Sequence, residues 1–133
     1  MLAFLPASAD IGIITYNVDK LNFKHLEQLG VPTTAHKRIR IVGPPADGYL
    51  QNLVRGKGPY DQEGLTDEIV SVAKRLVSTA PATRAIVLEC TQLPPFAEAI
   101  QRALDGKVAV YDAHTMGCWF YSGLVSRRPE YWK

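Results

Sequence analysis

Four short runs rich in β-branched and other apolar residues, separated by segments with helical spacing, constrain the fold of this chain most. The runs cover residues 11–16, 38–43, 85–90 and 108–112. Strands that alternate with helices form right-handed βαβ units, in which parallel strands share one sheet. We therefore predict a single α/β domain over residues 1–133. It should be a three-layer, flavodoxin-like, four-stranded parallel sheet with helices on both faces, in strand order 2-1-3-4.

Capping residues and apolar spacing place the helices between these strands. One helix should follow Asn22 and end at Gly30, and a second should run from Thr66 to Pro81. Two more are predicted over about 95–104 and 113–124. Residues 46–64 contain four glycines and read as a functional loop, although residues 49–54 could form a short helix. Residues 1–112 would then form the core of the domain, and 113–133 a closing helix and tail.

Composition excludes several classes of protein. The net charge is +2 and 21% of residues are charged, so we expect no nucleic-acid partner; the basic clusters at 37–40 and 127–128 are interpreted as surface features. No apolar run approaches the length of a membrane span, and the first residues lack the basic start of a signal peptide. The two cysteines are predicted to be free thiols in a reducing cytoplasm.

Cys90 is the strongest candidate for catalysis. It lies in Glu89-Cys90-Thr91, at the carboxyl end of a predicted buried strand and just before a predicted helix. Ligands of parallel α/β sheets bind at this edge, and a helix N-terminus favours a thiolate. The alternative for Cys90 is a small buried core residue. Thr91 could bind a carboxylate or simply cap the helix, whereas Glu89 should point to the other side of the strand and be structural.

The other strand ends supply polar side chains to the same edge. Thr15, Tyr16 and Asn17 could bind an anionic ligand or form a turn through their own hydrogen bonds. Asp112 could support a ligand, although capping of the last helix is favoured, and His114 is a possible supporting residue. The histidines and cysteines show no metal-site spacing, so we expect no metal.

Cys118 lies in Met116-Gly-Cys-Trp-Phe-Tyr, inside the last predicted helix, and is predicted to be a core residue.

Three segments resemble the aspartate/glutamate/hydantoin racemase superfamily, which also holds arylmalonate decarboxylase and maleate isomerase. They are Ile11-Gly-Ile-Ile-Thr-Tyr-Asn, Val87-Leu-Glu-Cys-Thr-Gln-Leu-Pro-Pro, and Val110-Tyr-Asp with the aromatic helix that follows. The resemblance implies cofactor-independent chemistry at the carbon next to a carboxylate, on an amino acid such as aspartate or glutamate. Cys90 would be one of two acid/base thiols. Thr91 and residues 15–17 would bind the substrate.

The resemblance covers only the second of that superfamily's two lobes and its closing helix. The first lobe, with the first cysteine, has no counterpart, and Cys118 does not match it. The leading hypothesis is therefore a racemase-like half whose Cys90 works with a partner lobe or in a homodimer. The start at Met1 reads as a truncated frame or a detached half. The alternatives are an inactive remnant or small-anion-binding module, and a one-cysteine decarboxylase or maleate isomerase.

Overall fold

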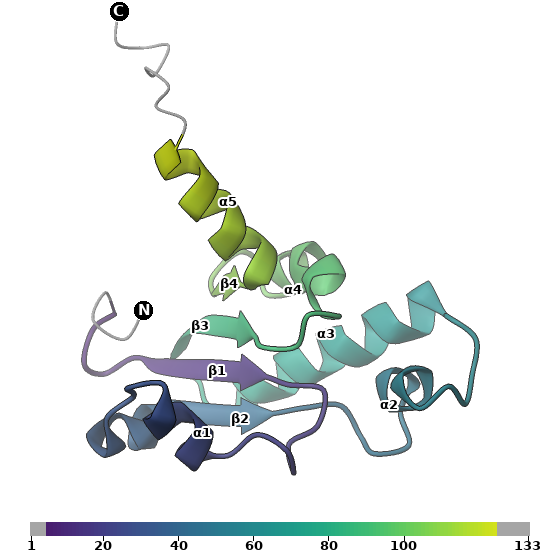
Figure 1. Cartoon of the computed structure of the whole chain (residues 1–133), viewed down its shortest axis with the longest axis horizontal. Coiled ribbons are helices and arrows are strands. Elements are labelled where there is room, and N and C mark those ends of the chain that lie inside the picture. The colour runs from purple at the N-terminus through teal and green to yellow at the C-terminus, as the bar shows by residue number, and fades with distance from the viewer. Residues whose placement is uncertain (1–4, 125–133) are drawn as a thin grey trace, which may run out of the picture.

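The four predicted strands form one parallel sheet. The computed structural model describes residues 5–124 (Figure 1). The strands are β1 (Asp10–Ile14), β2 (Ile39–Val42), β3 (Thr83–Leu88) and β4 (Ala109–Tyr111), and their order is β2-β1-β3-β4. All three strand pairings are parallel. The predicted α/β, flavodoxin-like class and the strand order 2-1-3-4 are therefore confirmed.

The helices lie between the strands in sequence. They are α1 (Phe23–Gln28), the 3-10 helix η2 (Thr33–Arg38), α2 (Tyr49–Val54), α3 (Gln62–Thr79), the 3-10 helix η3 (Pro94–Phe96), α4 (Ala97–Ala103) and α5 (Ala113–Leu124). The capping pattern around Asn22 holds, since its side chain accepts a hydrogen bond from the Lys24 N–H. No helix among residues 5–124 is long and apolar enough to cross a membrane.

One face of the sheet carries the main core. Strand residues such as Ile14, Ile86 and Val110 pack there against α3 and α4, and are buried almost completely. Gly12 in β1 makes this packing possible, because a Cβ atom at Gly12 would collide with the Leu76 side chain of α3. The central strand therefore meets its covering helix at a position where only glycine fits without a shift.

The other face is covered only in part. There, α1 packs against β1 and β2 through a smaller apolar cluster, which consists of Ile13, Leu26 and Ile39. Over β3 and β4 the same face borders an open groove that contains Val87 and Tyr111. The closing helix α5 does not cover it: Figure 1 shows α5 projecting away from the sheet, and none of its residues is buried.

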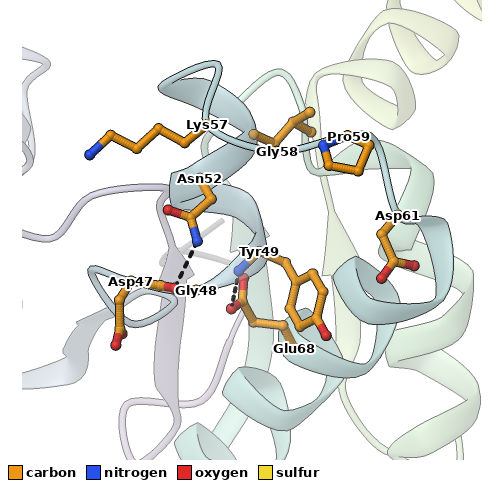
Figure 2. A pocket seen from close by; sticks show the side chains of 10 residues that line it. Asp47, Gly48, Tyr49, Asn52, Lys57, Gly58, Pro59, Asp61 and Glu68 are labelled. Atoms are coloured by element: carbon orange, nitrogen blue, oxygen red, sulfur yellow. Dashed lines mark hydrogen bonds between the residues drawn. The ribbon is translucent and has the colours of Figure 1, made fainter.

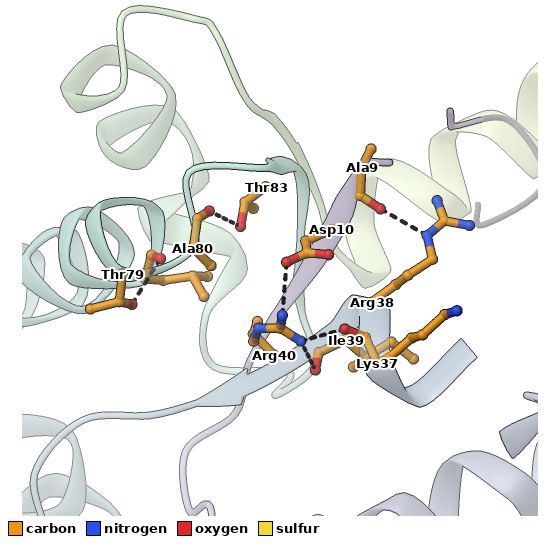
Figure 3. A network of polar contacts seen from close by, with 10 residues as sticks. Ala9, Asp10, Lys37, Arg38, Ile39, Arg40, Thr79, Ala80 and Thr83 are labelled. Carbon is orange, nitrogen blue, oxygen red and sulfur yellow. Dashed lines mark hydrogen bonds and ion pairs between the residues drawn. The ribbon is translucent and has the colours of Figure 1, made fainter. Parts of the chain in front are cut away.

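Polar contacts tie the amino ends of β1 and β2 together, at the edge opposite the predicted site (Figure 3). The Arg40 guanidinium lies 3.1 Å from the Asp10 carboxylate, and the Arg38 Nε donates to the Ala9 carbonyl at 2.9 Å. The basic side chains of the 37–40 cluster thus lie along the amino end of the sheet, and Lys37 and Arg40 are exposed, as the interpretation of a surface feature expects.

Three predictions need correction. The long helix α3 begins at Gln62 and not after Thr66, because the Asp61 side chain accepts the Gly64 N–H at 3.0 Å and caps it. The irregular stretch is correspondingly shorter, and residues 49–54 do form a helix. Cys118 is exposed, so its assignment to the core is wrong: α5 buries no residue. The tail at 125–133, with its basic pair at 127–128, lies outside the described residues.

Candidate functional site

The carboxyl ends of β1 and β3 are joined by side chains as well as by backbone. The hydroxyl of Thr15, a residue that is only 2% exposed, donates to the Glu89 carboxylate at 2.8 Å. The Glu89 N–H donates to the Ile14 carbonyl at 3.0 Å. Glu89 is therefore structural, as predicted, and its bond occupies the Thr15 hydroxyl. Sequence reasoning placed both residues at this edge but did not foresee that they bind each other.

Cys90 follows at the head of a tight turn. The Cys90 carbonyl accepts the Leu93 N–H at 3.0 Å, and its side chain is half-buried and packs against the main core, as that of Tyr16 does. Cys90 is a free thiol. The helix predicted over about 95–104 is present as η3 and α4, but η3 begins at Pro94 and α4 at Ala97, so the helix start lies four or more residues beyond Cys90. The helix-dipole argument for a Cys90 thiolate therefore loses its basis, and the position at the sheet edge remains.

The turn after β1 is held from α2. The buried side chain of Gln51 donates through Nε2 to the Tyr16 carbonyl. The Asn17 carboxamide oxygen accepts the Asp19 N–H at 2.9 Å, which is the local turn that sequence reasoning gave as the alternative to ligand binding. Gln51 was missed at the sequence level. Its only signal is a polar residue beside Leu50 in a segment that was expected to be a loop.

Thr91 is exposed and does not cap a helix, since the N-cap position of α4 is Phe96 and that of η3 is Leu93. Its capping role is therefore wrong, because the turn after Cys90 delays the helix. The carboxylate-binding role predicted for Thr91 is left as a prediction. Thr91 is exposed in the turn that follows Cys90.

Asp112 fixes the start of α5. It is buried, its carboxylate accepts the Thr115 N–H at 2.6 Å, and its own N–H donates to the Thr115 hydroxyl at 2.9 Å. The favoured interpretation of Asp112 as a helix cap is confirmed. His114 is exposed, and its Nε2 lies 3.6 Å from the Cys118 Sγ one turn further along α5. Its predicted supporting role is not tested by these contacts.

Two pockets lie near the carboxyl edge of the sheet, and Cys90 is not among the residues that line either of them. A groove of about 750 Å³ lies between α5 and the open face of β3 and β4, and Glu89 and Asp112 stand at one end of it. A second pocket of about 370 Å³ lies between α2 and the loop that leads to α3 (Figure 2). There the Glu68 carboxylate accepts the N–H groups of Tyr49 and Leu50 at 2.8 and 3.0 Å, so it acts as the cap of α2.

Over the part of the chain that the structure describes, no group of three or more His, Cys, Asp or Glu side chains is placed to hold a metal ion. The groups present at the edge are a half-buried thiol, backbone amides and the anchored carboxylate of Glu89. Such a set can accept or return a proton, and its amides can bind an anion.

The known proteins to which this chain is similar are not those of the superfamily that the sequence suggested. Similar regions occur in three proteins, one from Durusdinium sp. clade D and two from Emiliania huxleyi (strain CCMP1516). All three proteins are named dimethylsulfoniopropionate lyases. The protein from Durusdinium sp. clade D is 43% identical over 67 residues, which cover 50% of this chain and 22% of the relative. Lyase 5 of Emiliania huxleyi (strain CCMP1516) is 31% identical over 121 residues, covering 87% of this chain and 23% of the relative.

Lyase 7 of the same alga is 36% identical over 69 residues, or 49% of this chain and 20% of the relative. The chain thus spans less than a quarter of the length of the curated relatives it matches. No protein-family profile matches it, and no solved structure is significantly similar.

The resemblance to the racemase superfamily is therefore corrected. The relatives are named as lyases, so neither a racemase nor an isomerase is supported. The Cys-Thr-proline motif that carried the resemblance sits on a strand end of a common sheet architecture, and such architectures host many unrelated activities. Among the sequence-based alternatives, the one-cysteine decarboxylase is the closer, because decarboxylases are also lyases.

Proposed function

We propose that this chain forms part of a lyase site that cleaves dimethylsulfoniopropionate, or a closely related carboxylate with a sulfonium group on its β-carbon. One observation carries the proposal: the 31% identity to lyase 5 extends over 87% of the chain. A match over that share of 133 residues must take in the segment around Cys90. The half-buried thiol at the sheet edge supplies the chemistry that such a cleavage needs.

The reaction is a β-elimination. Cys90, as its thiolate, removes a proton from the carbon next to the carboxylate. The electron pair of that C–H bond forms the double bond between the α- and β-carbons. The bond from the β-carbon to sulfur breaks, and its electrons leave with neutral dimethyl sulfide. Acrylate remains, and the proton on Cys90 passes to solvent, so charge and atoms balance.

The carboxylate of the substrate must be bound by hydrogen-bond donors, because charge builds up next to it as the proton leaves. The turn at Tyr16 and Asn17 and the exposed turn at Thr91 are proposed to provide these donors. Thr15 is proposed to act indirectly, because its hydroxyl already holds Glu89 and so sets the spacing of the two strand ends. The mechanism needs Cys90 reduced, which a cytoplasmic location would ensure.

Release of dimethyl sulfide tests the proposal. The 133-residue chain is incubated with dimethylsulfoniopropionate, and the headspace is analysed by gas chromatography. We expect release that Cys90→Ala lowers by a factor of about 10² or more, the usual contribution of a positioned base. Cys118→Ser is the matched control, since it removes the exposed thiol on α5 and should keep full activity. Release that is equal in the wild type and Cys90→Ala would reject the role of Cys90.

A second candidate is a small-anion-binding module without turnover. It is favoured by the low coverage of the relatives, since most of each relative has no counterpart in this chain. Titration with acrylate, followed by backbone amide shifts in NMR spectra, distinguishes it. Shifts at residues 15–17 and 89–92 without any dimethyl sulfide release would favour the module over the enzyme.

A further inference from the structure

Gln51 brings a buried carboxamide from α2 to the carboxyl edge of the sheet. The residue is only 4% exposed, and its Nε2 donates to the Tyr16 carbonyl, 35 positions away in the sequence. A buried carboxamide costs free energy unless it is hydrogen-bonded, so this contact decides where the Gln51 side chain lies. The same contact fixes one peptide group of the turn that follows β1.

The position of Gln51 is set by α3. The Glu68 carboxylate accepts the N–H groups of Tyr49 and Leu50, which ties the first turn of α2 to α3 (Figure 2). Gly48 permits this approach, because a Cβ atom at Gly48 would collide with the Glu68 carboxylate. The Leu50 side chain is also buried in the main core. α2 is thus held at its start and by its core side chain, and it presents Gln51 to the turn from a fixed position.

The chain just before the turn is anchored to both neighbouring strands. The Thr15 N–H donates to the Val42 carbonyl of β2 at 3.0 Å, and the Thr15 hydroxyl donates to the Glu89 carboxylate that follows β3. Gln51 then holds the next carbonyl along the chain, that of Tyr16. Three different elements therefore fix the backbone as it leaves β1.

The peptide group between Tyr16 and Asn17 carries both the anchored carbonyl and an unused donor. This peptide is trans, and the C=O and N–H of a planar trans peptide point in opposite directions. Because Gln51 binds the carbonyl, the Asn17 N–H points away from Gln51. Within residues 5–124 this N–H has no acceptor, and Asn17 is only half-buried, so a ligand can reach it.

We propose that Gln51 is a positioning residue, which aims the Asn17 N–H at the carboxylate of the substrate. The inference rests on the proposed function, in which the turn at Tyr16 and Asn17 binds that carboxylate. A hydrogen bond from an N–H to a carboxylate is charge-assisted, and its strength depends on the direction of the N–H. Without the Gln51 contact the peptide group can rotate, and the donor loses its alignment. Gln51 acts through the backbone and does not touch the substrate.

The test compares Gln51→Met with the matched control Asn52→Leu. Each replacement keeps the approximate shape of the side chain and removes the donor. Asn52 is the next residue of α2, and its Nδ2 also donates to a backbone carbonyl, that of Asp47 at 2.9 Å, which lies outside the turn. We expect Gln51→Met to raise the KM for dimethylsulfoniopropionate and the Kd for acrylate by about ten-fold, with kcat changed by less than about three-fold. Asn52→Leu should leave all three values unchanged.

These readouts separate positioning from stability. A variant that is partly unfolded has a lower apparent kcat, but the KM and the acrylate Kd of its folded fraction stay the same. Circular dichroism checks the fold of each variant. An NMR titration of the wild type with acrylate needs no variant at all: the Asn17 amide proton should shift strongly, because its hydrogen bond to the carboxylate is new.

The outcomes distinguish this inference from the proposed function. Release of dimethyl sulfide with equal KM and equal acrylate affinity in wild type and Gln51→Met would overturn the positioning role alone, as would an Asn17 amide that bound acrylate does not shift. Acrylate binding without release would reject the lyase, and weaker acrylate binding by Gln51→Met would still support the positioning role. A wild type that neither releases dimethyl sulfide nor binds acrylate would overturn both.

Discussion

The hydrogen bond between Thr15 and Glu89 allows a sharp prediction, because its two partners differ in burial. Thr15 is 2% exposed, whereas Glu89 lies at the surface. In Thr15→Val, the Glu89 carboxylate regains water and the valine fills the same space, so we expect a loss of at most about 1 kcal/mol in the free energy of unfolding. In Glu89→Ala, the buried hydroxyl loses its acceptor, and we expect a loss of about 1–3 kcal/mol.

The double variant completes the cycle. Once Thr15 is valine, no buried hydroxyl is left to satisfy, so adding Glu89→Ala should cost only a few tenths of a kcal/mol. Urea unfolding, followed by circular dichroism, gives the free energy of unfolding of the wild type and the three variants. The dependence of that free energy on urea concentration should be the same for all four proteins. The reasoning fails if Thr15→Val costs more than Glu89→Ala, or if the two single losses add in the double variant.

Three further predictions concern packing, thiol exposure and capping. Gly12→Ala should destabilise the domain by about 1–3 kcal/mol in urea unfolding, since its new methyl group displaces Leu76; an unchanged midpoint would contradict the close packing. Cys118 should react with a bulky maleimide faster than the half-buried Cys90, because access and not acidity limits so large a reagent, and mass spectrometry of partly labelled protein should show this order; the reverse order would contradict it. Asp112→Ala should cost about 0.5–2 kcal/mol and raise amide hydrogen exchange at the start of α5; unchanged exchange there would argue against capping.

The order of the sheet could be predicted because apolar runs and helical spacing are local signals that cover most of the chain. The boundaries of the helices were harder to predict from the sequence. Thr66 and Asp61 both precede an apolar helical pattern, and only the tertiary structure decides that Asp61 is the cap. Cys118 was misplaced for a related reason: the apolar character of its helix indicates a contact, but sequence does not say whether that contact lies within the same chain.

The candidate site was predicted in part. That Cys90 and Thr15 lie at one sheet edge follows from strand ends alone, and the structure agrees. The Glu68 cap of α2 and the Gln51 contact with the turn could not be predicted, because each joins segments that are distant in sequence. The family was wrong because a short cysteine motif on a common fold says little about the reaction.

The position of β1 in the middle of the sheet has a consequence for how the chain folds. β1 can pair with β2 early, but its other neighbour is β3, and the Thr15–Glu89 bond spans 74 positions. Contacts of such separation are slow to form, since a long loop must close before they contribute stability. On a ribosome, the edge that carries Cys90 would therefore be assembled only after most of the domain has been synthesised. Until then, the apolar β1–β2 pair is left without its second partner, and an unpaired strand edge of this kind is prone to aggregate.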